Sequence, residues 1–116
     1  MNAARPPAGT SLCPVEALDP TGARGFAFTE GEARFTGFVV RVGDAAVGYV
    51  DRCPHAGWPL AFREDDYLTR DRAFVICAGH GALFRREDGV CVAGPCAGRA
   101  LTPWPVRVED GQLIAA

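Results

Sequence analysis

The sequence predicts an all-β fold. From about residue 25 onward, short runs rich in Val, Phe, Tyr and Ile alternate with turn-forming dipeptides, which is the pattern of short strands rather than of long helices. Three of these dipeptides have the composition of tight hairpin loops. A length of 116 residues fits one domain. We therefore expect a single domain over residues 11–116, preceded by a loose tail at residues 1–10.

The earliest elements are short. Cys13, within the sequence SLCPVEAL, is expected to be an apolar strand residue, and the sequence DPTG at residues 19–22 predicts a turn. Three hairpins should follow in chain order. They pair the runs 38–42 with 46–50, 82–84 with 90–92, and 105–108 with 112–114, around Gly43-Asp44, Asp88-Gly89 and Asp110-Gly111. Together these hairpins predict a meandering antiparallel sheet.

Two further segments carry local signals. Pro103 and Pro105 have no amide donor, so their strand should lie at a sheet edge or begin late. The charged stretch at residues 62–72 has some helix-compatible polarity, but we interpret it as a solvated loop.

Composition limits the function classes. The net charge of −2 argues against a nucleic-acid partner, because phosphate binding needs a clustered excess of basic residues. No apolar run is long enough for a signal peptide or a membrane-spanning helix, so we expect a soluble, cytoplasmic protein. Five cysteines in such a chain favour metal or redox chemistry over a disulfide framework.

Two short motifs point to a metal centre. The sequence CPHAGWPL contains Cys53 and His55, and the sequence CAGHGALF contains Cys77 and His80, which supply the only two histidines of the chain. Two thiolates and two imidazoles suit either a tetrahedral zinc site or a [2Fe–2S] cluster with two Cys on one iron and two His on the other. Zinc modules tend to pair Cys with Cys and His with His, whereas each motif here supplies one of each, which favours the cluster.

These two motifs resemble the cluster-binding loops of Rieske proteins, and the resemblance covers most of the chain. It implies a small antiparallel β-sandwich base that carries a cluster-binding subdomain of two facing loops, at about residues 52–97. It also implies that Cys53, His55, Cys77 and His80 bind one [2Fe–2S] cluster. The sequence Gly94-Pro95-Cys96 is similar to the third loop that packs over the cluster in this family.

Departures from the family pattern bear on the reduction potential. High-potential members place Ser and Tyr hydroxyls near the cluster sulfurs, and this chain has Ala82 and Phe84 at those positions. Those members also join the two loops by a disulfide, and the corresponding positions here are Trp58 and Gly79. Hydrogen bonds to sulfur stabilise the more negative reduced cluster, so their loss predicts a potential towards the low end of the Rieske range, roughly −150 to +300 mV.

The resemblance implies electron transfer rather than catalysis, because the chain has no room for the separate catalytic domain of Rieske oxygenases. We expect a soluble ferredoxin that passes single electrons from a flavin reductase to an oxygenase or another redox enzyme. The alternatives are a non-catalytic subunit or redox-sensing module of a larger complex, and a zinc-stabilised interaction domain. Iron and acid-labile sulfide in the purified protein would separate the first two from the third.

The remaining cysteines and one aromatic residue receive weaker predictions. Cys91 and Cys96 are close enough in sequence for a disulfide, but a cytosolic setting favours two buried thiols. Trp58 is expected to pack near the site and to keep water away from it.

Overall fold

The computed structural model describes residues 3–54 and 57–116, and within these ranges it contains nine strands and one short 3₁₀ helix. The elements are β1 (Ser11–Pro14), η1 (Val15–Leu18), β2 (Ala23–Glu30), β3 (Ala33–Val42), β4 (Ala45–Val50), β5 (Phe74–Ile76), β6 (Leu83–Arg85), β7 (Cys91–Ala93), β8 (Val106–Glu109) and β9 (Gln112–Ala115). All pairings between the strands are antiparallel, so the predicted all-β class is confirmed. In this part of the chain, no helix is long and apolar enough to cross a membrane.

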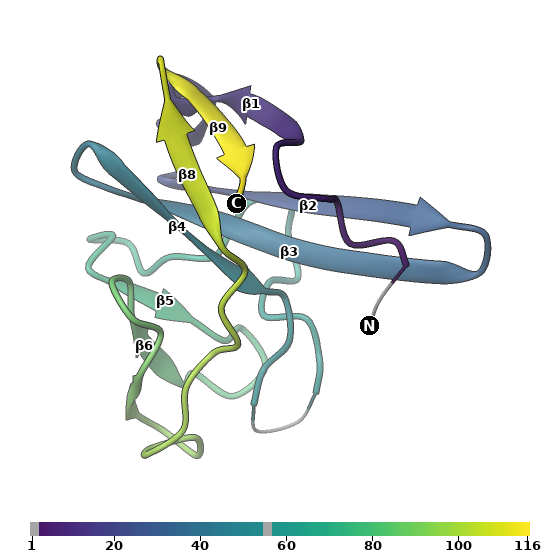
Figure 1. Cartoon of the computed structure of the whole chain (residues 1–116). Helices are drawn as coiled ribbons and strands as arrows, with labels where there is room; N and C mark the ends of the chain where they lie inside the picture. Colours follow the sequence, from purple (N-terminus) through teal and green to yellow (C-terminus); the bar gives the residue numbers. More distant parts are fainter. Residues whose placement is uncertain (1–2, 55–56) are drawn as a thin grey trace.

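The strands form three separate sheets of three strands each, in the orders β2-β3-β4, β1-β9-β8 and β5-β6-β7. The predicted single meander is therefore wrong. The β2-β3-β4 and β5-β6-β7 sheets are each built from consecutive strands and are separated in sequence by residues 51–73, while the β8-β9 hairpin pairs with β1 from the start of the chain. Figure 1 shows the long β2-β3-β4 sheet crossing the molecule, with β8 and β9 on one side of it and β5 and β6 on the other.

The base is the part formed by the first two sheets, and Trp104 lies at its centre. This side chain is 1% exposed, and the rings of Phe26, Phe28 and Phe35 meet it edge-on at centroid distances of 5.9, 6.3 and 5.2 Å. Gly48 on β4 allows the backbone to come close, because a Cβ atom there would lie 2.3 Å from the Trp104 carbonyl oxygen. Close packing on a glycine thus joins the two sheets.

All three predicted hairpins form between paired strands; the loops at 43–44 and 110–111 have two residues, whereas the loop around Asp88-Gly89 is longer than predicted and runs over residues 86–90. Gly43, Gly89 and Gly111 have positive φ angles of 60°, 74° and 75°. Asp110 also has a positive φ of 52°, as expected for a two-residue loop whose twist matches the flanking strands. Strand β8 begins after Pro105 and lies at the edge of its sheet, which confirms the prediction from the two prolines.

The N-terminal segment, expected to be a loose tail, makes three contacts with the rest of the chain. Ala4 is 6% exposed, the Arg5 guanidinium lies 5.6 Å from the centre of the Phe35 ring, and the Gly9 amide donates a hydrogen bond to the Ala115 carbonyl at 2.7 Å. Apolar, cation–π and backbone contacts therefore attach Ala4, Arg5 and Gly9 to the base.

The charged stretch at residues 62–72 is a loop, as predicted, but it is not merely solvated. Tyr67 is buried and stacks on Phe38 with ring centroids 4.3 Å apart and an interplanar angle of 7°. Its hydroxyl donates to Asp51 Oδ2 at 2.8 Å. Asp65 Oδ1 accepts a hydrogen bond from the Gly25 amide on β2 at 2.7 Å. The loop thus fastens the third sheet to the base.

Candidate metal centre

The first cysteine loop follows strand β4. The Cys53 amide donates a hydrogen bond to the Trp58 carbonyl at 2.7 Å, and the Gly57 amide donates to the Cys53 carbonyl at 2.8 Å. Gly57 has a φ of 72°, which a residue with a side chain rarely adopts. These two backbone bonds close a tight loop that begins at a cysteine with 1% exposure.

The second cysteine loop follows strand β5 and repeats the same bonding. The Cys77 amide donates to the Ala82 carbonyl at 2.9 Å, and the Gly81 amide donates to the Cys77 carbonyl at 2.8 Å. Gly81 has a φ of 71°. Both loops therefore close between the cysteine and the residues four and five positions later, although the histidine of each motif sits at a different offset from its cysteine.

The two cysteine sulfurs meet in the interior. Cys77 is 2% exposed, and its sulfur lies within hydrogen-bonding reach of the Cys53 sulfur. Burial raises the pKa of the Cys77 thiol and the Cys53 sulfur raises it further, while the amides of Gly79 and His80 donate to the Cys77 sulfur and lower that pKa. Backbone donors that stabilise a negative sulfur are suited to a metal-bound thiolate.

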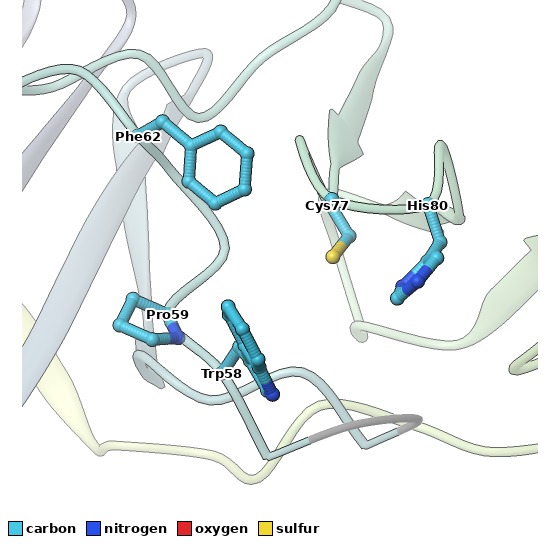
Figure 2. Close-up of a pocket in the computed structure, with 6 residues that line it drawn as sticks. Trp58, Pro59, Phe62, Cys77 and His80 are labelled. Atoms are coloured by element: carbon cyan, nitrogen blue, oxygen red, sulfur yellow. The ribbon is translucent and has the colours of Figure 1, made fainter.

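His80 lies on the exposed side of the same site. A pocket of about 230 Å³ opens between the two loops. Its lining residues are Trp58, Pro59, Phe62, Cys77, Gly79 and His80. Figure 2 shows the Cys77 sulfur and the His80 ring pointing into this pocket from one side, with Trp58 and Phe62 facing them from the other. The predicted ligand His55 lies outside the described residues.

Trp58 lies beside the site, as expected, but most of its side chain is exposed. It is 64% exposed, and Phe62 beside the same pocket is 68% exposed. Both aromatic rings thus border the site and face solvent.

The third loop reaches the first cysteine. Cys96 is completely buried, and its Sγ lies 3.8 Å from the Cys53 Sγ. Arg99 Nη1 donates to the Pro54 carbonyl at 3.1 Å, which holds the same two loops together at the surface. Cys91 and Cys96 are both buried thiols, as predicted. The third loop therefore packs directly against one half of the site.

The second motif presents no hydroxyl near the sulfurs. Ala82 and Phe84 are both completely buried, and neither side chain has a hydrogen-bond donor. Gly94 lies tightly against the second loop, since a Cβ atom there would come within 2.8 Å of the Ala82 Cα. A side chain at position 94 would therefore clash with the backbone of Ala82.

Sequence reasoning did not single out three residues that shape this site. Asp51 lies just before the first loop, and its Oδ1 accepts a hydrogen bond from the Leu60 amide at 2.9 Å. Phe62 and Arg99 border the site from distant loops. Of these three residues, only Asp51 has a local feature in the sequence, because it is a charged residue that directly follows an apolar strand.

The donor set fits an iron–sulfur cluster. Two buried sulfurs meet in the interior, backbone amides point at one of them, and one imidazole lies at the exposed edge. Within residues 3–54 and 57–116, no three His, Cys, Asp or Glu side chains stand close enough to hold a single metal ion. A two-iron cluster divides its ligands between two metals and does not need such a group.

Solved structures with a similar fold include two ferredoxins and a chain from an oxygenase–ferredoxin complex. The ferredoxin of carbazole 1,9a-dioxygenase from Nocardioides aromaticivorans IC177 has a TM-score of 0.69 and 21% identity, over 95% of this chain and 98% of that chain. The ferredoxin of Sphingomonas yanoikuyae B1 has a TM-score of 0.66 and 21% identity, over 92% and 96%. A chain from the complex of reduced oxygenase and oxidized ferredoxin in carbazole 1,9a-dioxygenase has a TM-score of 0.68 and 24% identity, over 92% and 91%.

The sequence itself carries the family assignment. No curated protein is a significant match to this chain. The model of the Rieske [2Fe-2S] domain, however, matches residues 10–112, which is most of the sequence. Members of this family hold a [2Fe–2S] cluster with two Cys and two His ligands. The chain therefore belongs to the Rieske [2Fe-2S] domain family.

Proposed function

We propose that this chain is a one-electron carrier, and that Cys53, His55, Cys77 and His80 hold its [2Fe–2S] cluster. The bound cluster would supply reversible uptake of a single electron. In this proposal the two cysteines bind one iron and the two histidines bind the other. The cluster-binding subdomain covers about residues 52–97 of a single domain at residues 11–116.

The observation that carries this proposal is the contrast in burial across the site. Cys53 and Cys77 are 1% and 2% exposed, whereas His80, three residues after Cys77, is exposed at the mouth of a pocket. Buried sulfurs keep water away from the thiolates, while an exposed imidazole gives a partner protein a short path to the metal. This arrangement suits electron exchange with another protein more than reaction with a small substrate.

We propose that the partners are a flavin reductase as donor and an oxygenase or another redox enzyme as acceptor, both in the cytoplasm. The structural relatives support this choice, since one comes from a complex between an oxygenase and a ferredoxin, and another is the ferredoxin of a dioxygenase. Trp58 and Phe62 support it as well, because exposed aromatic side chains beside the site provide apolar contact area for a protein partner.

We further propose that the carrier has a low reduction potential for its class. Ala82 and Phe84 are buried beside the second cysteine and cannot donate a hydrogen bond from their side chains. The reduced cluster therefore lacks two stabilising contacts, and the midpoint should fall towards the low end of roughly −150 to +300 mV. A clearly positive midpoint in a redox titration would contradict this part of the proposal.

The first experiment measures iron and acid-labile sulfide in the purified full chain and records the electron paramagnetic resonance spectrum after reduction with dithionite. We expect two iron and two sulfide atoms per chain, with a signal displaced from that of all-cysteine clusters. The Cys77→Ala variant should lose the signal, whereas the Cys91→Ala variant, which removes another buried thiol, should keep it. Zinc with no sulfide in the wild-type protein would overturn the proposal.

The second experiment tests the direction of electron flow. The purified protein is mixed with a flavin-dependent ferredoxin reductase and NADH, and its visible spectrum is followed as the cluster is reduced. Reoxidation by an added oxygenase component should restore the original spectrum. A protein that binds the cluster but exchanges no electrons with any reductase, and instead stays tightly attached to one large partner, would favour a non-catalytic subunit.

A further inference from the structure

The buried contact between the third loop and the first cysteine loop points to a role for Cys96. We propose that the Cys96 thiol donates a hydrogen bond to the Cys53 sulfur and so raises the reduction potential of the cluster. The inference rests on the proposed function, because it requires Cys53 to be a cluster ligand. Cys96 acts through Cys53, so it is a positioning residue and not a fifth ligand.

The distance suits a hydrogen bond between two sulfur atoms. The Cys96 Sγ and the Cys53 Sγ are 3.8 Å apart, and either atom of an unligated pair could be the donor. A cysteine that binds metal has lost its proton, so in the loaded protein only Cys96 can donate. The roles of donor and acceptor are therefore fixed by metal binding.

Burial makes this weak donor effective. Cys96 is 0% exposed and Cys53 is 1% exposed, so water does not compete for the thiol proton or for the sulfur. The Arg99 contact to the Pro54 carbonyl, at 3.1 Å, holds the third loop against the first loop and keeps the two sulfurs together. A thiol is a weak donor in water, but low local polarity strengthens its bond to a negative sulfur.

The direction of the effect follows from charge. Uptake of one electron makes the cluster and its ligand sulfurs more negative, so a donor at Cys53 stabilises the reduced state more than the oxidised state. The Cys96 thiol thus opposes the lowering that follows from Ala82 and Phe84. The structure supplies one weak sulfur donor in the third loop, while the second loop has no side-chain donor at those two positions.

A matched control lies on the neighbouring strand. Cys91 is also a buried thiol of this subdomain, with 4% exposure, but its Sγ donates to the Ala93 carbonyl at 3.2 Å. Its proton is therefore directed to the backbone and not to a ligand. The Cys91→Ala variant removes the same chemical group from the same region and leaves the Cys53 contact in place.

The experiment compares midpoint potentials of cluster-loaded proteins by spectroelectrochemical titration. Cys96→Ala and Cys96→Val both remove the donor, and Val fills most of the space that Ala would leave empty. Both should lower the equilibrium constant for reduction by on the order of threefold to tenfold, where tenfold corresponds to about 59 mV for a one-electron couple. Cys96→Ser keeps a donor, and a hydroxyl is a stronger donor than a thiol, so its potential should rise above the wild-type value. Cys91→Ala should match the wild type.

Each outcome decides the question. Equal potentials for Cys96→Ala, Cys96→Val and the wild type overturn the hydrogen bond, even though the carrier function would stand. If neither of these variants loads a cluster, Cys96→Ser decides, because a hydroxyl is a stronger donor and must raise the potential; an unchanged value overturns the proposal. A Cys96→Ser protein whose cluster signal in electron paramagnetic resonance is lost would instead indicate that Cys96 is itself an iron ligand, which overturns the proposal. Absence of iron from the wild-type protein would refute the proposed function itself, and with it this inference.

Discussion

Replacing Tyr67 by Phe should loosen the first cysteine loop without altering the core. The change removes one hydroxyl and keeps the ring that stacks on Phe38 at 4.3 Å. That hydroxyl donates to Asp51 Oδ2 at 2.8 Å, while Asp51 Oδ1 accepts from the Leu60 amide at 2.9 Å. The carboxylate is thus held from both sides, and loss of one partner frees it to turn away from Leu60.

The free energy lost in Tyr67→Phe follows from the charge of the acceptor, the Asp51 carboxylate. A hydrogen bond to a charged group contributes about 1.5 to 3 kcal/mol. Asp51 is only half-buried, so the lower end, about 1.5 kcal/mol, is appropriate. Since 1.4 kcal/mol is about tenfold in an equilibrium constant, local opening around Leu60 should become about ten times more frequent in Tyr67→Phe.

Hydrogen exchange read by mass spectrometry on the full, cluster-loaded chain measures this opening without unfolding the protein. The peptide that contains Leu60 should exchange about tenfold faster in Tyr67→Phe. In the control, Tyr49→Phe, the lost hydroxyl donates to the Arg86 carbonyl at 2.7 Å, a neutral acceptor. That variant should accelerate exchange around Arg86 by a smaller factor and leave Leu60 unchanged. Unaltered exchange at Leu60 in Tyr67→Phe, or equal acceleration in both variants, would refute the reasoning.

Three further outcomes are expected. Burial, and then nearby carboxylates, raise the pKa of Tyr67 and Tyr49 in the folded protein above the ordinary tyrosine value of 10.0. Above about pH 10 the two hydroxyls therefore ionise in the unfolded chain before they ionise in the folded protein, which stabilises the unfolded state. The thermal midpoint should fall as the pH rises above about 10, and it should fall less steeply in Tyr67→Phe. Gly48→Ala should destabilise the fold by about 1 to 3 kcal/mol or more, because its Cβ would lie 2.3 Å from the Trp104 carbonyl oxygen; an unchanged midpoint would contradict this close approach. Trp104→Ala should cost about 3 to 5 kcal/mol and reduce the yield of folded protein, since three aromatic rings pack on this side chain.

The parts of the fold that the sequence predicted correctly depend on local chemistry. The hairpins around Gly43, Gly89 and Gly111 were predictable because a tight loop needs particular residues at two adjacent positions. The pairing of Cys53 with Cys77 was predictable because each motif carries its metal chemistry within a few residues. Both predictions depend on residues that are neighbours in sequence, so they do not require knowledge of the contacts made by the rest of the chain.

The features that the sequence did not predict depend on contacts between distant segments. Burial of Ala4 and Tyr67 requires the base and the charged loop to be in place first, and a polar stretch gives no sign of that. The Cys96 contact follows from the path of the third loop. The assignment of His55 as a ligand stays a prediction, since this residue lies outside the described ranges.

The shared closure of the two cysteine loops bears on the order in which the protein matures. Each loop is held by two backbone hydrogen bonds, to and from Cys53 in one and Cys77 in the other, and none of these four bonds uses a side chain. Residues held by such backbone bonds lose conformational entropy when the chain folds and not when metal binds. We therefore expect the chain to fold before it binds the cluster, so that iron and sulfide bind to a protein whose fold is already formed.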